Sequence, residues 1–186
     1  NELTPMVATA RLIKQEHPDA SVVFIGPCAS KKLEASRRTV RSDVDFVITF
    51  EELTGMFEAK GILLDEIKAM DEMKDATAAG RGYGVAGGVA NAIKECIEQY
   101  YPGTPVNIQH AESLAECKKA LLLAKAGKMN GCLIEGMACP GGCIAGAGTN
   151  IAIPVAAKAV DKFKNEAEKK VPDESVDQEM VELEKR

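Results

Sequence analysis

Two cysteines lie close together in a glycine-rich segment, Glu135 to Gly148 (EGMACPGGCIAGAG). The thiols belong to Cys139 and Cys143, and glycines break helices and permit positive φ angles, so we expect a loop or short turn after a short buried strand. Backbone without side chains can approach a bulky ligand and direct N–H groups at it, and thiolates bind iron. The segment therefore favours an anionic metal–sulfur cluster, although the C-x-x-x-C spacing alone is also typical of structural or zinc-binding cysteines.

A second cysteine loop lies upstream and also follows an apolar run of strand length. The run is SVVFI at 21–25, and the loop GPCASKKLE at 26–34 contains Cys28. In parallel sheets ligands bind beyond the carboxyl ends of the strands. Three thiolates, from Cys28, Cys139 and Cys143, are therefore expected to converge at one end of a sheet.

Four further side chains near these cysteines each allow two interpretations. Lys31 places an ammonium beside an anionic ligand, or it belongs to a solvated basic helix over 31–38. Met137 lines a ligand pocket, or it packs within the loop. Glu34 and Glu135 are hydrogen-bonding or proton-relay carboxylates, or they are helix caps and ion-pair partners.

The other cysteines and the histidines give weaker signals. Cys96 and Cys117 lie in apolar periodic segments, where a free cysteine acts as a small hydrophobic residue. Cys132 reads the same way, but it is near enough to the glycine-rich segment to be a spare ligand. His17 and His110 have no ligand spacing around them, so a zinc site of cysteines and histidines has little support.

Composition excludes several classes of protein. The net charge of −5 argues against binding to nucleic acid or to an anionic membrane, and no apolar run approaches the roughly 18 residues of a membrane span. Six cysteines without a secretory signal indicate a reducing compartment, the cytoplasm. The chain begins at Asn1 without a methionine, so we expect a piece of a larger protein.

Strand and helix signals alternate along the chain and predict an α/β fold with about four mainly parallel strands flanked by helices. We expect one domain over 1–171, with its N-terminal portion missing, and a charged tail over 172–186. The expected strands are 21–25, 46–49, 106–109 and 132–135. The expected helices run from Pro5 to before Pro18, over 31–38, from a Thr49–Glu52 capping box to Gly61, over 87–101, from a Ser113–Glu116 capping box to Gly127, and from after Asn150 to about Lys170.

At three places the sequence resembles the active-site domain of the [FeFe]-hydrogenases. PCASKKLE resembles the second signature of that family, PC-x-x-K-x-x-E. EGMACPGGCIAGAG resembles the third, E-x-M-x-C-x-x-G-C-x-x-G-x-G, and residues 83–89 resemble the Gly-Gly turn and helix start between them. The resemblance covers roughly residues 4–150.

The resemblance implies an H-cluster, a [4Fe-4S] cubane bridged through cysteine sulfur to a di-iron unit with CO, cyanide and a dithiolate. By position, Cys28 and Cys139 would be cubane ligands and Cys143 would bridge the cubane to the di-iron unit. Lys31 would hydrogen-bond a cyanide, and Met137 would line the pocket. The implied reaction is the reversible oxidation of dihydrogen to protons and electrons in an anaerobe, with a ferredoxin-like electron carrier or fused iron–sulfur domains as partner.

The sequence also departs from the family. The first signature, T-S-C-C-P, which supplies the fourth cubane ligand and the proton-relay cysteine, is absent. Gly26 stands where methionine is common, and Gly146-Ala147-Gly148-Thr149 replaces G-G-G-Q. We therefore expect a divergent or sensory-type branch of the family. The fragment itself should be inactive, free of its cluster and self-associated as a homo-oligomer. Two other classes stay open: a non-catalytic [4Fe-4S] module for electron transfer, assembly or hydrogen sensing, and an interaction domain whose thiols carry no iron.

Overall fold

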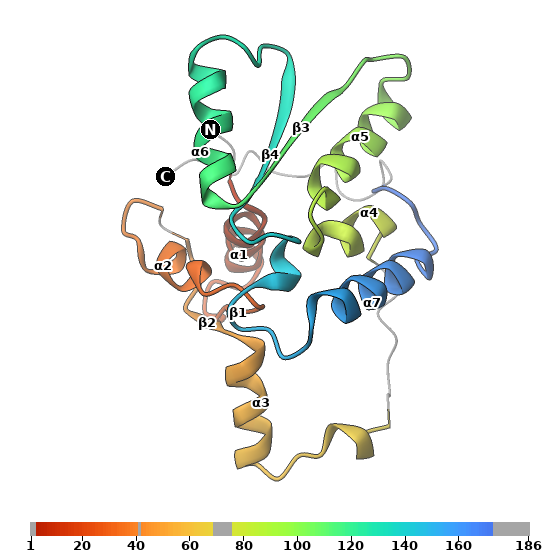
Figure 1. Ribbon diagram of the computed structural model, residues 1–186. Coiled ribbons are helices and arrows are strands. Elements are labelled where there is room, and N and C mark those ends of the chain that lie inside the picture. Colours follow the sequence, from red (N-terminus) through yellow and green to blue (C-terminus); the bar gives the residue numbers. More distant parts are fainter. Residues whose placement is uncertain (1–2, 41, 69–75, 173–186) are drawn as a thin grey trace. The chain divides into compact units, whose positions relative to one another are not determined.

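The computed structural model describes residues 3–40, 42–68 and 76–172 (Figure 1). These residues form two compact units. The first comprises the described residues up to 67 together with 147–150, and the second comprises the described residues of 68–146 together with 151–172. The short segment 147–150 thus belongs to the first unit although the chain on both sides of it belongs to the second.

The first unit holds one short parallel sheet. Its elements are α1 (Pro5–Glu16), β1 (Val23–Ile25), α2 (Ser30–Ser36), β2 (Phe46–Ile48), α3 (Phe50–Ala59) and the 3-10 turn η1 (Leu64–Glu66). β1 and β2 pair in parallel, with Phe24 opposite Val47. Both bonds of the expected Thr49–Glu52 capping box are present at the start of α3. The unit's core is the apolar face of α1 packed on Val44, with Met6, Val7 and Ala10 buried.

The segment 147–150 completes the first unit through backbone contacts. The Gly148 N–H donates to the Pro27 carbonyl (3.0 Å), and the Glu51 N–H donates to the Gly148 carbonyl (3.1 Å). A Cβ on Gly148 would lie 2.4 Å from Thr49 Cβ, so only glycine fits there. The Asn150 side chain donates to the Phe50 carbonyl (3.2 Å).

The second unit is built on a longer parallel pair of strands. Its elements are α4 (Ala78–Arg81), η2 (Gly82–Gly84), α5 (Gly88–Tyr100), β3 (Asn107–Glu112), α6 (Leu114–Lys125), β4 (Cys132–Met137), η3 (Cys143–Ala145) and α7 (Ile153–Asn165). β3 and β4 are in register from Asn107–Cys132 to Glu112–Met137. α6 and α5 flank this pair on opposite sides (Figure 1). The Glu135 side chain reaches α5, whereas Gly136 faces Cys117 on α6, as the alternation of a strand requires.

The α/β class and the parallel strand pairs are confirmed, but several element boundaries differ. β3 continues to Glu112 and β4 to Met137, so His110 and Met137, which lie beyond the expected strand ends, are strand residues. α7 ends at Asn165 because the carbonyls of Lys169 and Lys170 accept the N–H groups of Ala78 and Ala79 instead of continuing a helix. The single domain over 1–171 stays a prediction.

The predicted charged tail lies outside the described residues from 173 onward, as do residues 69–75. Among the helices that are described, none is both long and apolar enough to cross a membrane.

Candidate functional site

The first thiol loop follows the carboxyl end of β1 in the first unit. The Gly26 N–H donates to the Ile48 carbonyl of β2 (3.1 Å), and the Pro27 carbonyl accepts from Gly148 (3.0 Å). The Cys28 carbonyl accepts from the Lys31 N–H (3.3 Å) as α2 begins, and the Cys28 thiol is half-buried. The loop is therefore held by main-chain bonds on both sides of its cysteine.

Lys31 and Glu34, the charged residues of this loop's signature, bind each other. Lys31 Nζ lies 2.6 Å from Glu34 Oε2, and the Thr4 hydroxyl donates to Glu34 Oε1 (2.5 Å). Partial burial raises the pKa of Glu34, but the hydrogen bonds from Lys31 and Thr4 and the Lys31 charge outweigh it, so the pKa is lowered. Glu34 is thus an ion-pair partner, and a role for Lys31 toward a ligand stays a prediction.

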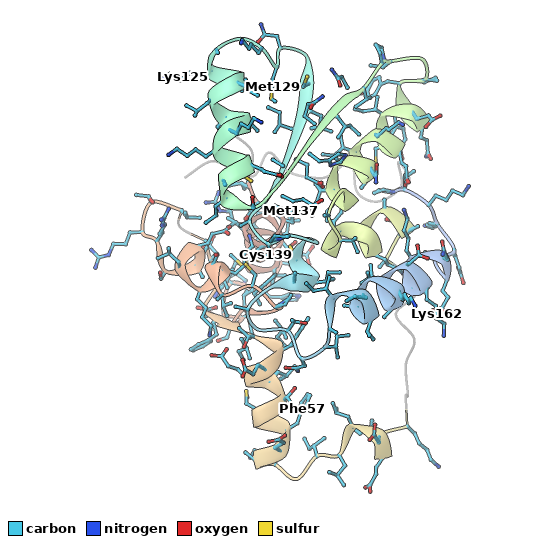
Figure 2. All side chains as sticks on the ribbon, viewed as in Figure 1. Phe57, Lys125, Met129, Met137, Cys139 and Lys162 are labelled. Atoms are coloured by element: carbon cyan, nitrogen blue, oxygen red, sulfur yellow. The ribbon has the colours of Figure 1, made fainter. Side chains whose placement is uncertain are left out.

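The second thiol loop follows the carboxyl end of β4 in the second unit, and Figure 2 shows Met137 and Cys139 at that end. Three hydrogen bonds fix the backbone between the two cysteines. The Gly141 N–H donates to Glu112 Oε2 (2.8 Å), the Ala86 N–H donates to the Gly141 carbonyl (3.1 Å), and the Gly142 N–H donates to the Cys139 carbonyl (3.0 Å). Cys139 is half-buried and Cys143 is exposed.

Glycine is required inside this loop because of a close backbone approach. Gly142 has a φ of +93°, and a Cβ there would lie 2.4 Å from the Ala86 nitrogen and 2.7 Å from the Val85 carbonyl carbon. No side chain fits at that distance. The Gly-Gly turn that the sequence places between the two signatures therefore packs directly against the second thiol loop.

Glu135 is a buried carboxylate that caps helix α5. Its two oxygens accept the N–H groups of Gly87 (2.6 Å), Val89 (3.0 Å) and Ala90 (3.0 Å). His110 Nδ1 lies 3.1 Å from Oε2. A negative charge here complements the positive end of the helix dipole and satisfies three N–H groups that lack intrahelical partners. Of the two interpretations of Glu135, the cap is the one this geometry supports.

Met137 bonds to Ser113 and lines a small cavity. Its carbonyl accepts the Ser113 N–H (2.8 Å). With Val89, Ala90 and Ile93 of α5 and the other residues of β4 from Leu133 onward, it lines a cavity of about 190 Å³. Whether Met137 also lines a cluster pocket stays a prediction.

Cys132 lies at the wrong end of β4 to be a spare ligand for the second loop. Five extended residues, about 16 Å, separate it from Met137. Its N–H bonds the Met129 carbonyl (3.2 Å), and Met129 lies at the opposite end of this unit from Met137 and Cys139 (Figure 2). Asn107 donates to its sulfur (3.2 Å).

The remaining two thiols are in packed surroundings. Burial, and secondarily the charge of Glu95, raise the pKa of Cys96, which disfavours the thiolate. Cys96 packs against the buried cluster of Ala79, Ala92 and Val171, as expected for an inert thiol. Cys117 Sγ lies 3.6 Å from the Ala111 carbonyl and is half-buried.

The three thiols chosen from the sequence are divided between the units. Cys139 and Cys143 share one loop of the second unit, and Cys28 belongs to the first. Within the ranges that the structure describes, no group of three or more His, Cys, Asp or Glu side chains is arranged to hold a single metal ion. The donors fit an iron–sulfur cluster in their chemistry, since thiolates are its usual ligands and the glycine backbone leaves room for a bulky group. The convergence of all three stays a prediction.

Three residues near the second loop gave no functional signal in the sequence: Glu112, Ser113 and His110. The Ser113–Glu116 capping box predicted that a helix begins here, but it did not predict the hydrogen bonds that these residues form with β4 and the second loop. Ser113 Oγ accepts the Glu116 N–H, whereas the Glu116 carboxylate accepts from Glu112 rather than from Ser113. The Ser113 N–H is already bonded to Met137.

Residues 1–147 match the protein family described as iron only hydrogenase large subunit, C-terminal domain. The chain belongs to this family. The match contains both thiol loops and the Gly-Gly turn between them, so the resemblance drawn from the three signatures is confirmed.

Individual relatives fit the same assignment. Over 53 residues the chain is 43% identical to the cytosolic Fe-S cluster assembly factor NAR1 of Kluyveromyces lactis. These 53 residues are 28% of this chain and 11% of that protein. This match is consistent with a divergent branch of the family.

Solved hydrogenase structures share the fold. A variant of apo [FeFe]-hydrogenase HydA1 from Chlamydomonas reinhardtii has a TM-score of 0.57 at 20% identity, covering 86% of this chain and 57% of that one. HydA(deltaEFG), from a study of stepwise H-cluster assembly, has a TM-score of 0.57 at 21% identity with the same coverage. The chain thus spans just over half the length of these hydrogenases.

Proposed function

We propose that this chain is an iron–sulfur cluster-binding domain of iron-only hydrogenase type, with Cys28, Cys139 and Cys143 as its metal ligands. The observation that carries the proposal is the family match over residues 1–147, which includes both thiol loops. Both loops follow the carboxyl ends of parallel strands, where α/β sheets bind their ligands. The iron–sulfur context is shared with the relatives of the chain.

Each side chain has a distinct role in this proposal. Cys28 and Cys139 would hold the cubane, and Cys143 would be the cysteine shared with the di-iron unit. Lys31, whose ammonium lies 2.6 Å from the Glu34 carboxylate, would donate a hydrogen bond to a cyanide of that unit. Met137 would line the pocket. When bound, the H-cluster supplies the reversible oxidation of dihydrogen to protons and electrons.

The chain by itself is not expected to turn over dihydrogen. The T-S-C-C-P signature does not occur in these 186 residues, so neither the fourth cubane ligand nor the proton-relay cysteine is supplied by them. For the whole protein we propose a cytoplasmic hydrogenase-type oxidoreductase that exchanges electrons with a ferredoxin-like carrier or with fused iron–sulfur domains.

A second candidate is a [4Fe-4S] module without hydrogen chemistry, used in cluster assembly, electron transfer or hydrogen sensing. The similarity to NAR1, described as a cytosolic Fe-S cluster assembly factor, favours it. The two candidates differ in one ligand set, because only an H-cluster carries CO and cyanide. Infrared bands of these ligands in the whole protein would support the hydrogenase-type function, and a cubane without them would support the second candidate.

Cluster binding itself is tested by anaerobic reconstitution of the chain with iron, sulfide and a small thiol to complete the iron coordination. About four irons per chain and the EPR signal of a reduced cubane are expected. Cys28→Ser, Cys139→Ser and Cys143→Ser should each lower the iron content. Cys132→Ser and Cys96→Ser are matched controls and should not. No iron in the unmodified chain, or equal loss in loop and control variants, would contradict the proposal.

A further inference from the structure

A sharp corner between β3 and α6 contacts the second thiol loop on both sides of Cys139. Before Cys139, the Ser113 N–H donates to the Met137 carbonyl (2.8 Å). After Cys139, the Glu112 carboxylate accepts the Gly141 N–H (2.8 Å). Glu112 also stands opposite Met137 in the strand register, so the corner and the loop face each other along the sheet edge.

The backbone of this corner is strained. Ser113 has φ +103° and ψ 155°, a region that is essentially restricted to glycine. Such a conformation persists only where the surrounding contacts impose it, and it is most frequent at functional sites. At Ser113 the contacts that impose it are those to Met137 and to the first turn of α6, where Ser113 Oγ accepts the Glu116 N–H (3.3 Å).

Glu112 is itself fixed by helix α6. Its N–H donates to Glu116 Oε2 (2.8 Å), which ties the end of β3 to the helix. On the loop side, the Gly141 carbonyl accepts from Ala86 (3.1 Å). The two ends of the Gly141 residue are therefore held from different elements, the N–H by Glu112 and the carbonyl by the Gly-Gly turn.

We propose that Glu112 is a positioning residue for the iron–sulfur cluster, one that fixes Gly141 so that Cys139 and Cys143 are presented in one geometry before iron binds. The inference rests on the proposed function. A loop that is ordered before binding loses less conformational entropy on binding, so preorganisation raises affinity without adding a contact to the ligand.

The first test needs no cluster. Amide hydrogen exchange at Gly141 is measured by NMR in the cluster-free full chain for the wild type, Glu112→Ala and Glu112→Gln. Loss of the acceptor should lower the protection of this amide about tenfold in Glu112→Ala. Glu112→Gln keeps an acceptor oxygen and should restore most of the protection. Glu98→Ala, which removes an exposed carboxylate of α5, is the control and should leave Gly141 unchanged.

The second test is anaerobic reconstitution at limiting iron with the same four proteins. Glu112→Ala should bind the cluster about five- to tenfold more weakly and give a broadened EPR signal, and Glu112→Gln should restore both. If the wild type binds the cluster and the Glu112→Ala variant binds it equally well or more tightly, the positioning role alone is overturned. A wild-type chain that binds no iron would overturn the proposed function and the cluster role of Glu112 with it, while unchanged exchange at Gly141 would overturn the inference whether or not iron binds.

Discussion

The two thiol loops both follow the end of a parallel strand and are both held by main-chain bonds, but the side chains around them differ. Around Cys28, the charged side chains of α2 form ion pairs near water, Lys31 with Glu34 of the same helix (2.6 Å) and the exposed Lys32 with Glu52 (2.7 Å). Around Cys139, Gly142 packs directly on backbone, and Glu135 of the preceding strand, only 8% exposed, caps α5 through three hydrogen bonds.

The difference predicts two kinds of sensitivity. Ion pairs near water contribute little at neutral pH and weaken with acid and salt. Close backbone packing and buried hydrogen-bonded carboxylates contribute more and respond to a change of volume or to the loss of an acceptor. Substitutions around the second loop should therefore cost more stability than loss of the ion pairs around the first loop, and acid should act mainly on those ion pairs.

The largest effect is expected for Gly142→Ala. The added Cβ meets the Ala86 nitrogen at 2.4 Å with φ at +93°, so the variant should lose roughly 3–5 kcal/mol in the free energy of unfolding, measured by urea denaturation. Gly103→Ala is the control: its φ is +83°, but no atom lies within 4 Å of the added Cβ. It should lose only about 1–2 kcal/mol. Equal losses would contradict the close-packing explanation.

Glu135→Gln is expected to be next in size. The amide group replaces one acceptor oxygen with a donor that faces backbone N–H groups, which should cost about 2–3 kcal/mol. The comparison is Glu34→Gln in the first loop, where loss of a partly exposed ion pair should cost at most about 1 kcal/mol. Both are measured by urea denaturation at pH 7, and a larger loss for Glu34→Gln would reverse the contrast between the loops.

Acid should act on the first loop through Glu34. Its pKa in the folded protein is below its usual value of 4.5, so its stabilisation is fully present above that pH and is lost as the pH falls through the lowered pKa. The stability difference between wild type and Glu34→Gln should therefore shrink toward zero as the pH falls from above 4.5 through the lowered pKa. Urea titrations across this range check it, and a difference that grows with acid would be the wrong sign.

The smallest expected effect is an increase in stability. Ser113→Gly removes the backbone strain at φ +103° and loses only part of the helix cap, so it should stabilise the chain by about 1 kcal/mol. Ser113→Ala keeps the strain and loses the cap, and it should be less stable than wild type. Thermal unfolding of the three proteins gives the order, and a Gly variant below the Ala variant would show that the corner is unstrained.

Local signals in the sequence were enough for the four strands and six of the helices, but the short helix α4 was not among the expected elements. The capping box at Thr49 and Glu52 needs only residues three apart, and the structure forms both of its bonds. The same pattern at Ser113 and Glu116 forms only one of its two bonds. The Ser113 N–H donates to the carbonyl of Met137, which is distant in sequence, instead of to the Glu116 side chain. The end of α7 was placed too late for a similar reason, since Lys169 and Lys170 bond to residues near 78.

Contacts between distant residues decided the parts that could not be predicted. Glu135 sits in a signature, but whether it caps a helix or relays protons depends on Gly87, 48 residues earlier. Glu112 carried no pattern at all, and only the pairing of β3 with β4 brings it to Gly141. The residue types in the thiol loops were enough to predict their chemistry, whereas the groups that hold the loops in place depend on contacts between residues distant in sequence.

The place of residues 147–150 in the first unit has a consequence for biosynthesis. The Pro27 carbonyl beside Cys28 accepts from the Gly148 N–H, and at the start of α3 the Glu51 N–H donates to the Gly148 carbonyl while the Phe50 carbonyl accepts from the Asn150 side chain. Ribosomes add about 5–20 residues per second from the N-terminus, so the first unit waits several seconds after its own strands have emerged. The loop that holds Cys28 is therefore completed only after the ribosome has synthesised both cysteines of the second loop.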